Sequence, residues 1–152
     1  MYQWILLGHV VGAAILFGGH VYMEGMMAAA GRDEDRSVYM TTMLKTAGTA
    51  ERLMGPASII TLVFGVWLVL DSGAWSFEQL FVTIGFVVII AAFAISLFLM
   101  RPRSNDIKAS IAENGLTDEK ALADMKSLGN LVHVQTLLVA IALVVMVVKP
   151  GL

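Results

Sequence analysis

The stretch GHVVGAAILFGGHVYME, residues 8–24, is apolar almost throughout and yet contains two histidines, His9 and His20. It overlaps an apolar run, residues 5–23, that is long enough for a transmembrane helix, which needs about 20 residues. The chain has three histidines and no cysteine, and the third histidine, His133, lies in another apolar run. Any function assigned to the chain therefore has to account for imidazoles placed inside a membrane.

The composition of the whole chain is that of a membrane protein. Hydrophobic residues make up 58% of the 152 residues, charged residues only 14%, and the mean hydropathy is +0.79. A soluble domain is about half apolar and about one quarter charged. No apolar run alternates with a period of two residues, and backbone hydrogen bonds in lipid must close within each segment, so we expect helices rather than a β-barrel. The sequence predicts one domain, residues 1–152, folded as an all-α four-helix transmembrane bundle with helices at about 5–23, 53–70, 80–100 and 131–148.

The distribution of basic residues predicts how the bundle is oriented. Of the ten Lys and Arg residues, four lie between the first and second helices and five between the third and fourth. Positively charged loops stay in the cytoplasm, so we expect both termini on the outer side of a bacterial inner (cytoplasmic) membrane. Trp4, Trp67 and Trp75 fall at the expected outer ends of the helices, as in an interfacial aromatic belt.

The two basic connections are expected to be helical in part. Residues 33–52 start with acids, which favour a helix N-terminus, and continue with apolar residues at helical spacing. Residues 101–130 are typical of two short helices, the first ending near Gly115 and the second beginning near Asp118. We expect Pro56 to begin the second transmembrane helix, where a missing N–H would be unpaired anyway.

His9 and His20 lie on one face of the first helix. Eleven residues place them about 20° from eclipsed and about 16 Å apart along the helix axis. Gly12 lies near the same stripe, and Gly8 with Gly12 forms a GxxxG pair, which indicates close helix packing. Small residues beside an imidazole would also leave room for a flat macrocycle.

His20 and His133 suggest a second arrangement, in which two histidines face each other. Both lie about one turn inside the expected cytoplasmic boundary, and they can meet if the first and fourth helices are neighbours, as is usual in a four-helix ring. Ionisable groups inside a membrane are costly and usually functional, and imidazole is the usual axial ligand of b-type haem. A bare zinc or copper ion held by His20, His133 and Glu24 or Glu51 is a weaker hypothesis, because structural zinc prefers four clear ligands.

The arginines, and the histidines as a group, each have two possible roles. Arg52, Arg101 and Arg103 could hold haem propionates or could mark the membrane boundary. Each histidine could instead make an interhelical hydrogen bond. The protein would then be a non-enzymatic membrane subunit or scaffold, with residues 33–52 and 101–130 docking a cytoplasmic partner. Nucleic-acid binding is not supported, because the membrane topology explains the basic connections.

Several segments together resemble the HemJ-type protoporphyrinogen oxidases. Residues 2–22 are similar to that family's first helix, residues 51–70 to its second and residues 136–150 to its closing helix. The residues in register in the first helix are Tyr2, Trp4, His9, Gly19 and Tyr22. The CopD-type copper-resistance domain and related four-helix bacterial membrane proteins share much of this pattern. The resemblance implies a haem b protein of the inner membrane with His9 as an axial ligand.

The chain departs from the HemJ pattern at positions that carry chemistry. The family's second ligand, a lysine at the start of the third helix, corresponds to Gln79, which offers no basic nitrogen. An acidic residue near the start of the fourth helix corresponds to His133. We therefore expect the fold and haem binding to transfer rather than the oxidation of protoporphyrinogen. Ligation by His20 with His133, and ligation by His9 with a weak partner or none, both stay open.

The sequence thus predicts an integral membrane protein that binds haem b and transfers electrons or oxidises a lipophilic reductant such as a quinol or porphyrinogen. It would then be a haem-dependent membrane oxidoreductase. The alternatives are the scaffold described above and a CopD-like protein that handles a metal without haem. The expected partners are the lipid bilayer, a quinone or porphyrin, and further subunits in a homo-oligomer or membrane complex.

Overall fold

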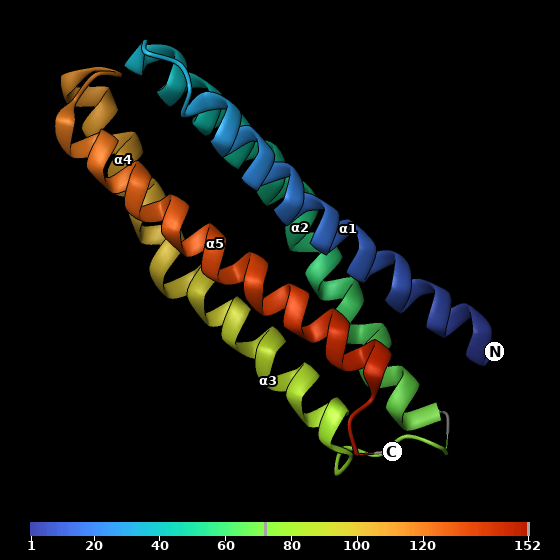
Figure 1. Ribbon diagram of the computed structural model, residues 1–152. Coiled ribbons are helices and arrows are strands. Elements are labelled where there is room, and N and C mark those ends of the chain that lie inside the picture. The colour runs from blue at the N-terminus through green and yellow to red at the C-terminus, as the bar shows by residue number, and fades with distance from the viewer. Residues whose placement is uncertain (72, 152) are drawn as a thin grey trace.

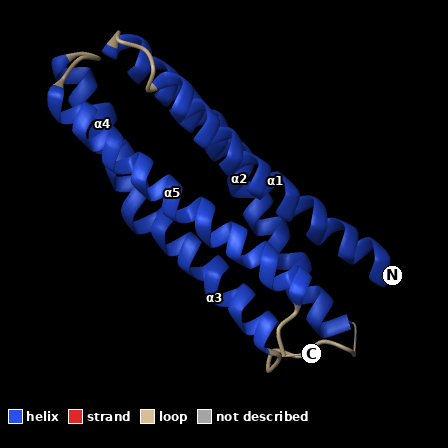
Figure 2. Cartoon of the chain, viewed as in Figure 1, coloured by secondary structure: helices blue, strands red, loops and turns tan. Residues whose placement is uncertain are grey.

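The computed structural model describes residues 1–71 and 73–151, and their regular structure is entirely helical (Figures 1 and 2). The elements are α1 (Tyr2–Ala30), α2 (Arg36–Asp71), α3 (Leu80–Ala94), the π-helical η1 (Ile95–Met100), α4 (Arg101–Asn114) and α5 (Glu119–Val148). The elements α3, η1 and α4 form one continuous helix, Leu80–Asn114. Four helices are therefore long and apolar enough to cross a membrane. The predicted all-α class and four transmembrane helices are confirmed.

The basic connections are helical in part, as predicted, but the two separate short helices expected in residues 101–130 are wrong, because each helical segment is continuous with a membrane helix. Residues 36–52 are the first part of α2, residues 101–114 continue the third membrane helix, and residues 119–130 are the first part of α5. Adding a residue to an existing helix costs much less than nucleating a new one, so the apolar segments extend into their polar neighbours. What is left of the two connections is residues 31–35 and residues 115–118.

Three local signals for helix ends had different outcomes. Gly115, with φ of +90°, follows the last residue of α4, and the Asp118 carboxylate accepts a hydrogen bond of 2.9 Å from the backbone N–H of Ala121 at the start of α5. Both predicted helix ends are confirmed. Pro56, by contrast, lies well inside α2 and does not begin it. Neighbouring helices make such an interior proline tolerable in a membrane, so the residue was misread as a start signal.

The helices form two antiparallel hairpins, α1 with α2 and the α3–η1–α4 helix with α5 (Figure 1). The hairpins meet mainly through α1 and α5, so the first and fourth transmembrane helices are neighbours, whereas α2 and α3 contact each other little. Both chain ends lie at one end of the bundle, called here the terminal end. The turns at 31–35 and 115–118 lie at the opposite end, called the loop end.

Small residues bring α1 and α2 close together. A Cβ atom added at Gly12 would lie 2.6 Å from Oγ1 of Thr61, and one added at Gly8 would lie 2.7 Å from the ring of Phe64. Each glycine therefore accepts a side chain of α2 against its own backbone, and the packing interpretation of the GxxxG pair is confirmed. The loop end has a separate apolar core, in which Met40 of α2 meets side chains of α4 and α5.

Candidate cofactor-binding site

His9 is held in one orientation by α2. Its Nδ1 lies 2.9 Å from the carbonyl oxygen of Thr61, and because a carbonyl only accepts, Nδ1 carries the proton and Nε2 keeps the lone pair. One edge of the ring rests against Gly65, where an added Cβ would come within 3.1 Å of His9 Cε1. The glycine and the carbonyl together fix the position and the tautomer of the imidazole.

His9 lines an apolar cavity of about 540 Å³ in the half of the bundle nearer the terminal end. The walls come from α1, α2, α3 and α5, so the cavity lies between the two hairpins. Small-molecule sites usually measure about 300–1,000 Å³ and combine apolar walls with a few polar groups. Here the polar groups include His9, Thr61 and Lys149. The arrangement can enclose a flat, largely apolar molecule.

An aromatic group lies beside the cavity at the terminal end. Trp75 donates through Nε1 to the hydroxyl oxygen of Tyr2, 3.4 Å away, and its ring meets Phe81 edge-on with the centroids 5.4 Å apart. Lys149 places Nζ 4.2 Å from the centroid of the Trp75 ring, a cation–π contact. The group joins α1, α3, the turn at 73–79 and the C-terminal segment. Sequence reasoning missed it because each partner comes from a different segment.

Met146 of α5 is a second residue that the sequence did not single out. It lines the same cavity as His9, and its terminal methyl group packs against the backbone of Gly85 in α3. A thioether is an axial haem ligand in some cytochromes. Among ten methionines, nothing in the spacing distinguishes Met146, because its place in the cavity depends on how α5 packs on α3.

His20 is buried in the middle of α1, with 3% of its surface exposed. Its Nδ1 donates to the carbonyl oxygen of Leu16 at 2.9 Å, so Nε2 keeps the lone pair. In the part of the chain that the structure describes, Nε2 is buried and has no hydrogen-bond partner. His20 does not line the cavity around His9.

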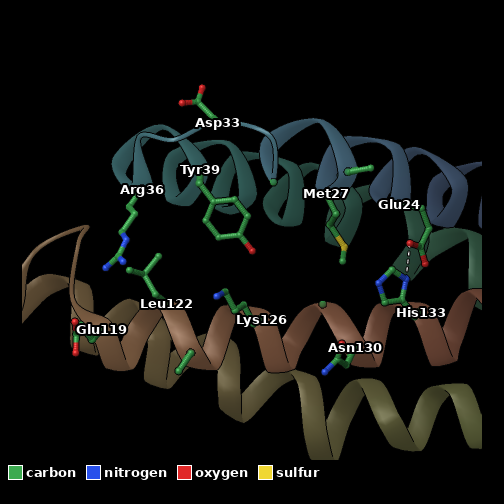
Figure 3. A pocket seen from close by; sticks show the side chains of 14 residues that line it. Glu24, Met27, Asp33, Arg36, Tyr39, Glu119, Leu122, Lys126, Asn130 and His133 are labelled. Carbon is green, nitrogen blue, oxygen red and sulfur yellow. Dashed lines mark ion pairs between the residues drawn. The ribbon is translucent and has the colours of Figure 1, made fainter.

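His133 lies on the surface of α5 and is paired with α1. Its Nδ1 is 2.5 Å from Oε2 of Glu24 (Figure 3). Oε1 of the same carboxylate accepts a hydrogen bond of 2.9 Å from the hydroxyl of Thr136. The predicted facing pair of His20 and His133 is thus replaced by a contact between His133 and Glu24. Among residues 1–71 and 73–151, no three His, Asp or Glu side chains gather closely enough to hold a metal ion.

The other predicted site residues lie away from the apolar cavity. Arg52 in α2 and Arg101 at the start of α4 are exposed. Gln79 stabilises the turn before α3, where its Oε1 accepts from the backbone N–H of Ser76 at 3.1 Å and its Nε2 donates to the carbonyl of Ala74 at 3.3 Å. None of the three residues lines the cavity. Of the residues predicted to hold a haem or a metal, only His9 lines this apolar cavity.

Comparison with known proteins identifies a membrane protein family but no activity. Comparisons with curated proteins and with solved structures gave no match. A family model with the description "Predicted integral membrane protein (DUF2269)" matches residues 3–150. That match supports a membrane protein family and does not single out the HemJ-type or CopD-type proteins. Since it spans nearly the whole chain, and since the four long apolar helices agree with it, the chain belongs to the DUF2269 family of predicted multi-pass integral membrane proteins.

Proposed function

We propose that the protein binds haem b in the apolar cavity, with His9 as an axial ligand. The observation that carries the proposal is the hydrogen bond between His9 Nδ1 and the Thr61 carbonyl. Histidines that bind metals almost always make such a bond through the other ring nitrogen, because it fixes the tautomer and raises the basicity of the ligating atom. His9 Nε2 is left with its lone pair, as an axial ligand requires.

The cavity fits a haem in three respects. Its volume of about 540 Å³ is in the range of small-molecule sites, and its walls are mostly apolar, as a porphyrin ring needs. Lys149 supplies a positive charge beside the Trp75 ring, where it could pair with a propionate. Met146 offers a thioether for the second axial position that Gln79 cannot fill.

When bound, the haem would supply one-electron redox chemistry. The chain would hold the ring through His9 and exclude water with the apolar walls of the two hairpins. The small contact between α2 and α3 favours entry from the bilayer, so the second substrate would be a lipophilic reductant such as a quinol or porphyrinogen. We place the protein in the bacterial inner membrane, with the loop end in the cytoplasm.

The test is the absorption spectrum of the full chain, purified in detergent and supplied with haem, before and after reduction with dithionite. We expect a Soret band and sharp reduced α and β bands in the wild type, lost in His9→Ala and kept in His133→Ala. A wild type that stays colourless after haem is supplied would refute the proposal. Bands lost only in His20→Ala would move the ligand to the buried Nε2 of that residue.

A second candidate is a scaffold in which the histidines hold helices together. It is favoured by the contacts of His133 with Glu24 and of His9 with Thr61, each of which joins two helices. This reading predicts that His9→Ala and His133→Ala lower the unfolding temperature without any haem being present. The spectrum separates the two candidates, because a scaffold has no Soret band.

A further inference from the structure

A second cavity of about 930 Å³ lies at the loop end, in the gap between the α1–α2 hairpin and α5 (Figure 3). At one end it is bounded by Glu24 and His133, close to the expected membrane boundary, and at the other by Arg36 and Glu119. From His133 to Glu119 the axis of α5 extends about 21 Å. The cleft is therefore long enough to run from the membrane boundary into the cytoplasmic extension of the bundle.

The basic side chains of this cleft point into it, whereas two of its three acids do not. Figure 3 shows Arg36 of α2 and Lys126 of α5 extending into the gap, and the hydroxyl of Tyr39 pointing into it as well. Asp33 and Glu119 point away from the gap. The basic groups thus face the interior of the cleft and these acids face the surroundings.

The acid that does point inward is already engaged. Both carboxylate oxygens of Glu24 are taken, one by His133 and the other by Thr136. Within the described part of the chain, by contrast, neither Arg36 nor Lys126 has an ion-pair partner. Two unpaired cations at the walls of one cleft raise the local positive potential, which attracts an anion.

We propose that the loop-end cleft binds an anion of the phosphate class, held by Arg36, Lys126 and the hydroxyl of Tyr39. The guanidinium suits a phosphate because it can donate two parallel hydrogen bonds, and the ammonium and the phenol can donate further ones. Met27 adds apolar wall on the membrane side of these groups, and Leu122 adds apolar wall beside Arg36. The site is separate from the His9 cavity and does not depend on haem.

Two sources could supply such an anion. An anionic phospholipid would place its headgroup at the basic residues and its acyl chains toward the membrane, as occurs in basic pockets between transmembrane helices on the cytoplasmic side. A free phosphorylated solute would enter from the cytoplasm. Both share the phosphate chemistry, so the experiment has to offer each one separately.

The experiment follows thermal unfolding of the full chain in detergent while an anion is titrated. The probes are dioleoylphosphatidylglycerol in mixed micelles and inorganic phosphate, with dioleoylphosphatidylcholine as the blank. We expect one of the two anions to raise the unfolding temperature in a saturable way. Saturation by phosphatidylglycerol alone indicates the lipid headgroup, and saturation by inorganic phosphate indicates a soluble anion.

Substitutions of Arg36 and Lys126 test whether these two residues bind the anion. Arg36→Gln and Lys126→Gln are each expected to weaken binding about fivefold, the effect of removing one basic residue at a membrane surface. Lys108→Gln is the matched control, since it removes the same charge from an exposed position on α4 outside the cleft and should bind as the wild type does. Lys126→Arg keeps the charge, so its binding should be retained even if Lys126→Gln folds poorly.

Either of two results overturns the proposal. The first is a wild type whose unfolding temperature responds to neither anion. The second is a folded Arg36→Gln/Lys126→Gln double variant that binds as tightly as Lys108→Gln. Loss in Lys126→Gln with retention in Lys126→Arg assigns the effect to the charge in the cleft.

Discussion

His9 and His20 lie on the same face of one helix, and yet their surroundings differ. His9 makes its hydrogen bond to another helix and borders a cavity, whereas His20 bonds to a carbonyl of its own helix and has no space beside it. Their spacing in the sequence contains no sign of this difference. His9 rests against Gly65 of α2, a contact that depends on how the two helices pack.

The buried Nε2 of His20, which has no partner in the described residues, lowers the stability of the folded protein. A buried acceptor without a partner costs about 1–3 kcal/mol, and an apolar residue of similar shape removes that cost. We therefore expect His20→Leu to unfold at the same temperature as the wild type or a higher one, measured by circular dichroism in detergent. His9→Leu is the control and should be destabilised, because it breaks the bond to Thr61. A marked loss of stability in His20→Leu would show that Nε2 has a partner in the native protein.

Gly65 gives a way to disturb His9 without removing it. In Gly65→Ala the new Cβ would lie 3.1 Å from Cε1 and 3.2 Å from Nδ1 of His9, so the ring has to shift and its bond to the Thr61 carbonyl weakens. Loss of such a supporting bond typically costs about 10–100-fold in metal affinity. A haem titration followed at the Soret band should show this loss. Gly18→Ala meets nothing within 4 Å and should titrate as the wild type does; equal affinities in both variants would contradict the role of His9.

Among the elements, the turn between α4 and α5 depends on one carboxylate. Asp118 accepts from the hydroxyl of Ser110 at 2.6 Å and from the N–H of Ala121, and these bonds, the one from Ser110 first, lower the pKa of Asp118 from its ordinary value of 3.8. A group whose pKa is lowered by folding stabilises the protein above its unfolded pKa and loses that effect as the pH falls through the folded pKa. The Asp118 turn should therefore stabilise the folded protein fully at neutral pH, and this contribution should fall below about pH 4.

Thermal unfolding at pH 7 and at pH 3 tests this turn. The wild type should lose stability between these two values in part through Asp118, and Asp118→Ala should be less stable at pH 7 but lose less on acidification. Glu113→Ala removes an exposed carboxylate at the end of α4 that makes no hydrogen bond in the described structure, and it should keep the behaviour of the wild type. If Asp118→Ala lost as much stability on acidification as Glu113→Ala, the carboxylate would have no capping role.

The helices also show which features of the fold could be predicted from the sequence. The four apolar runs predicted the membrane helices because hydropathy is a local property, and Gly115 and Asp118 predicted two helix ends because capping is local as well. Residues 33–52 were expected to be helical in part, but their continuity with the second membrane helix was missed, since helical spacing in a polar segment does not show whether it joins the helix that follows. His133 and Glu24 were expected together only as part of a metal site with His20. Their direct pairing without His20 was missed because it depends on the packing of α1 against α5.

At the scale of the whole molecule, two hairpins share a limited contact and enclose a cavity at each end. The apolar cavity holds His9, and the loop-end cleft holds Arg36 and Lys126. Any molecule bound in either cavity touches both hairpins, so it adds to the contact of α1 with α5 that joins them. A bound ligand should therefore raise the unfolding temperature of this protein more than that of a protein with one continuous core.

The haem proposal makes this effect measurable. A ligand at 100 times its dissociation constant stabilises the folded state by about 2.7 kcal/mol if it does not bind the unfolded chain. We expect added haem to raise the unfolding temperature of the wild type and of His133→Ala, followed by circular dichroism away from haem absorption. His9→Ala should gain nothing, because its cavity offers no imidazole. An equal rise in His9→Ala would mean that haem binds without ligation by His9, and His9 would then be left with the scaffold role, in which it serves only to join α1 to α2.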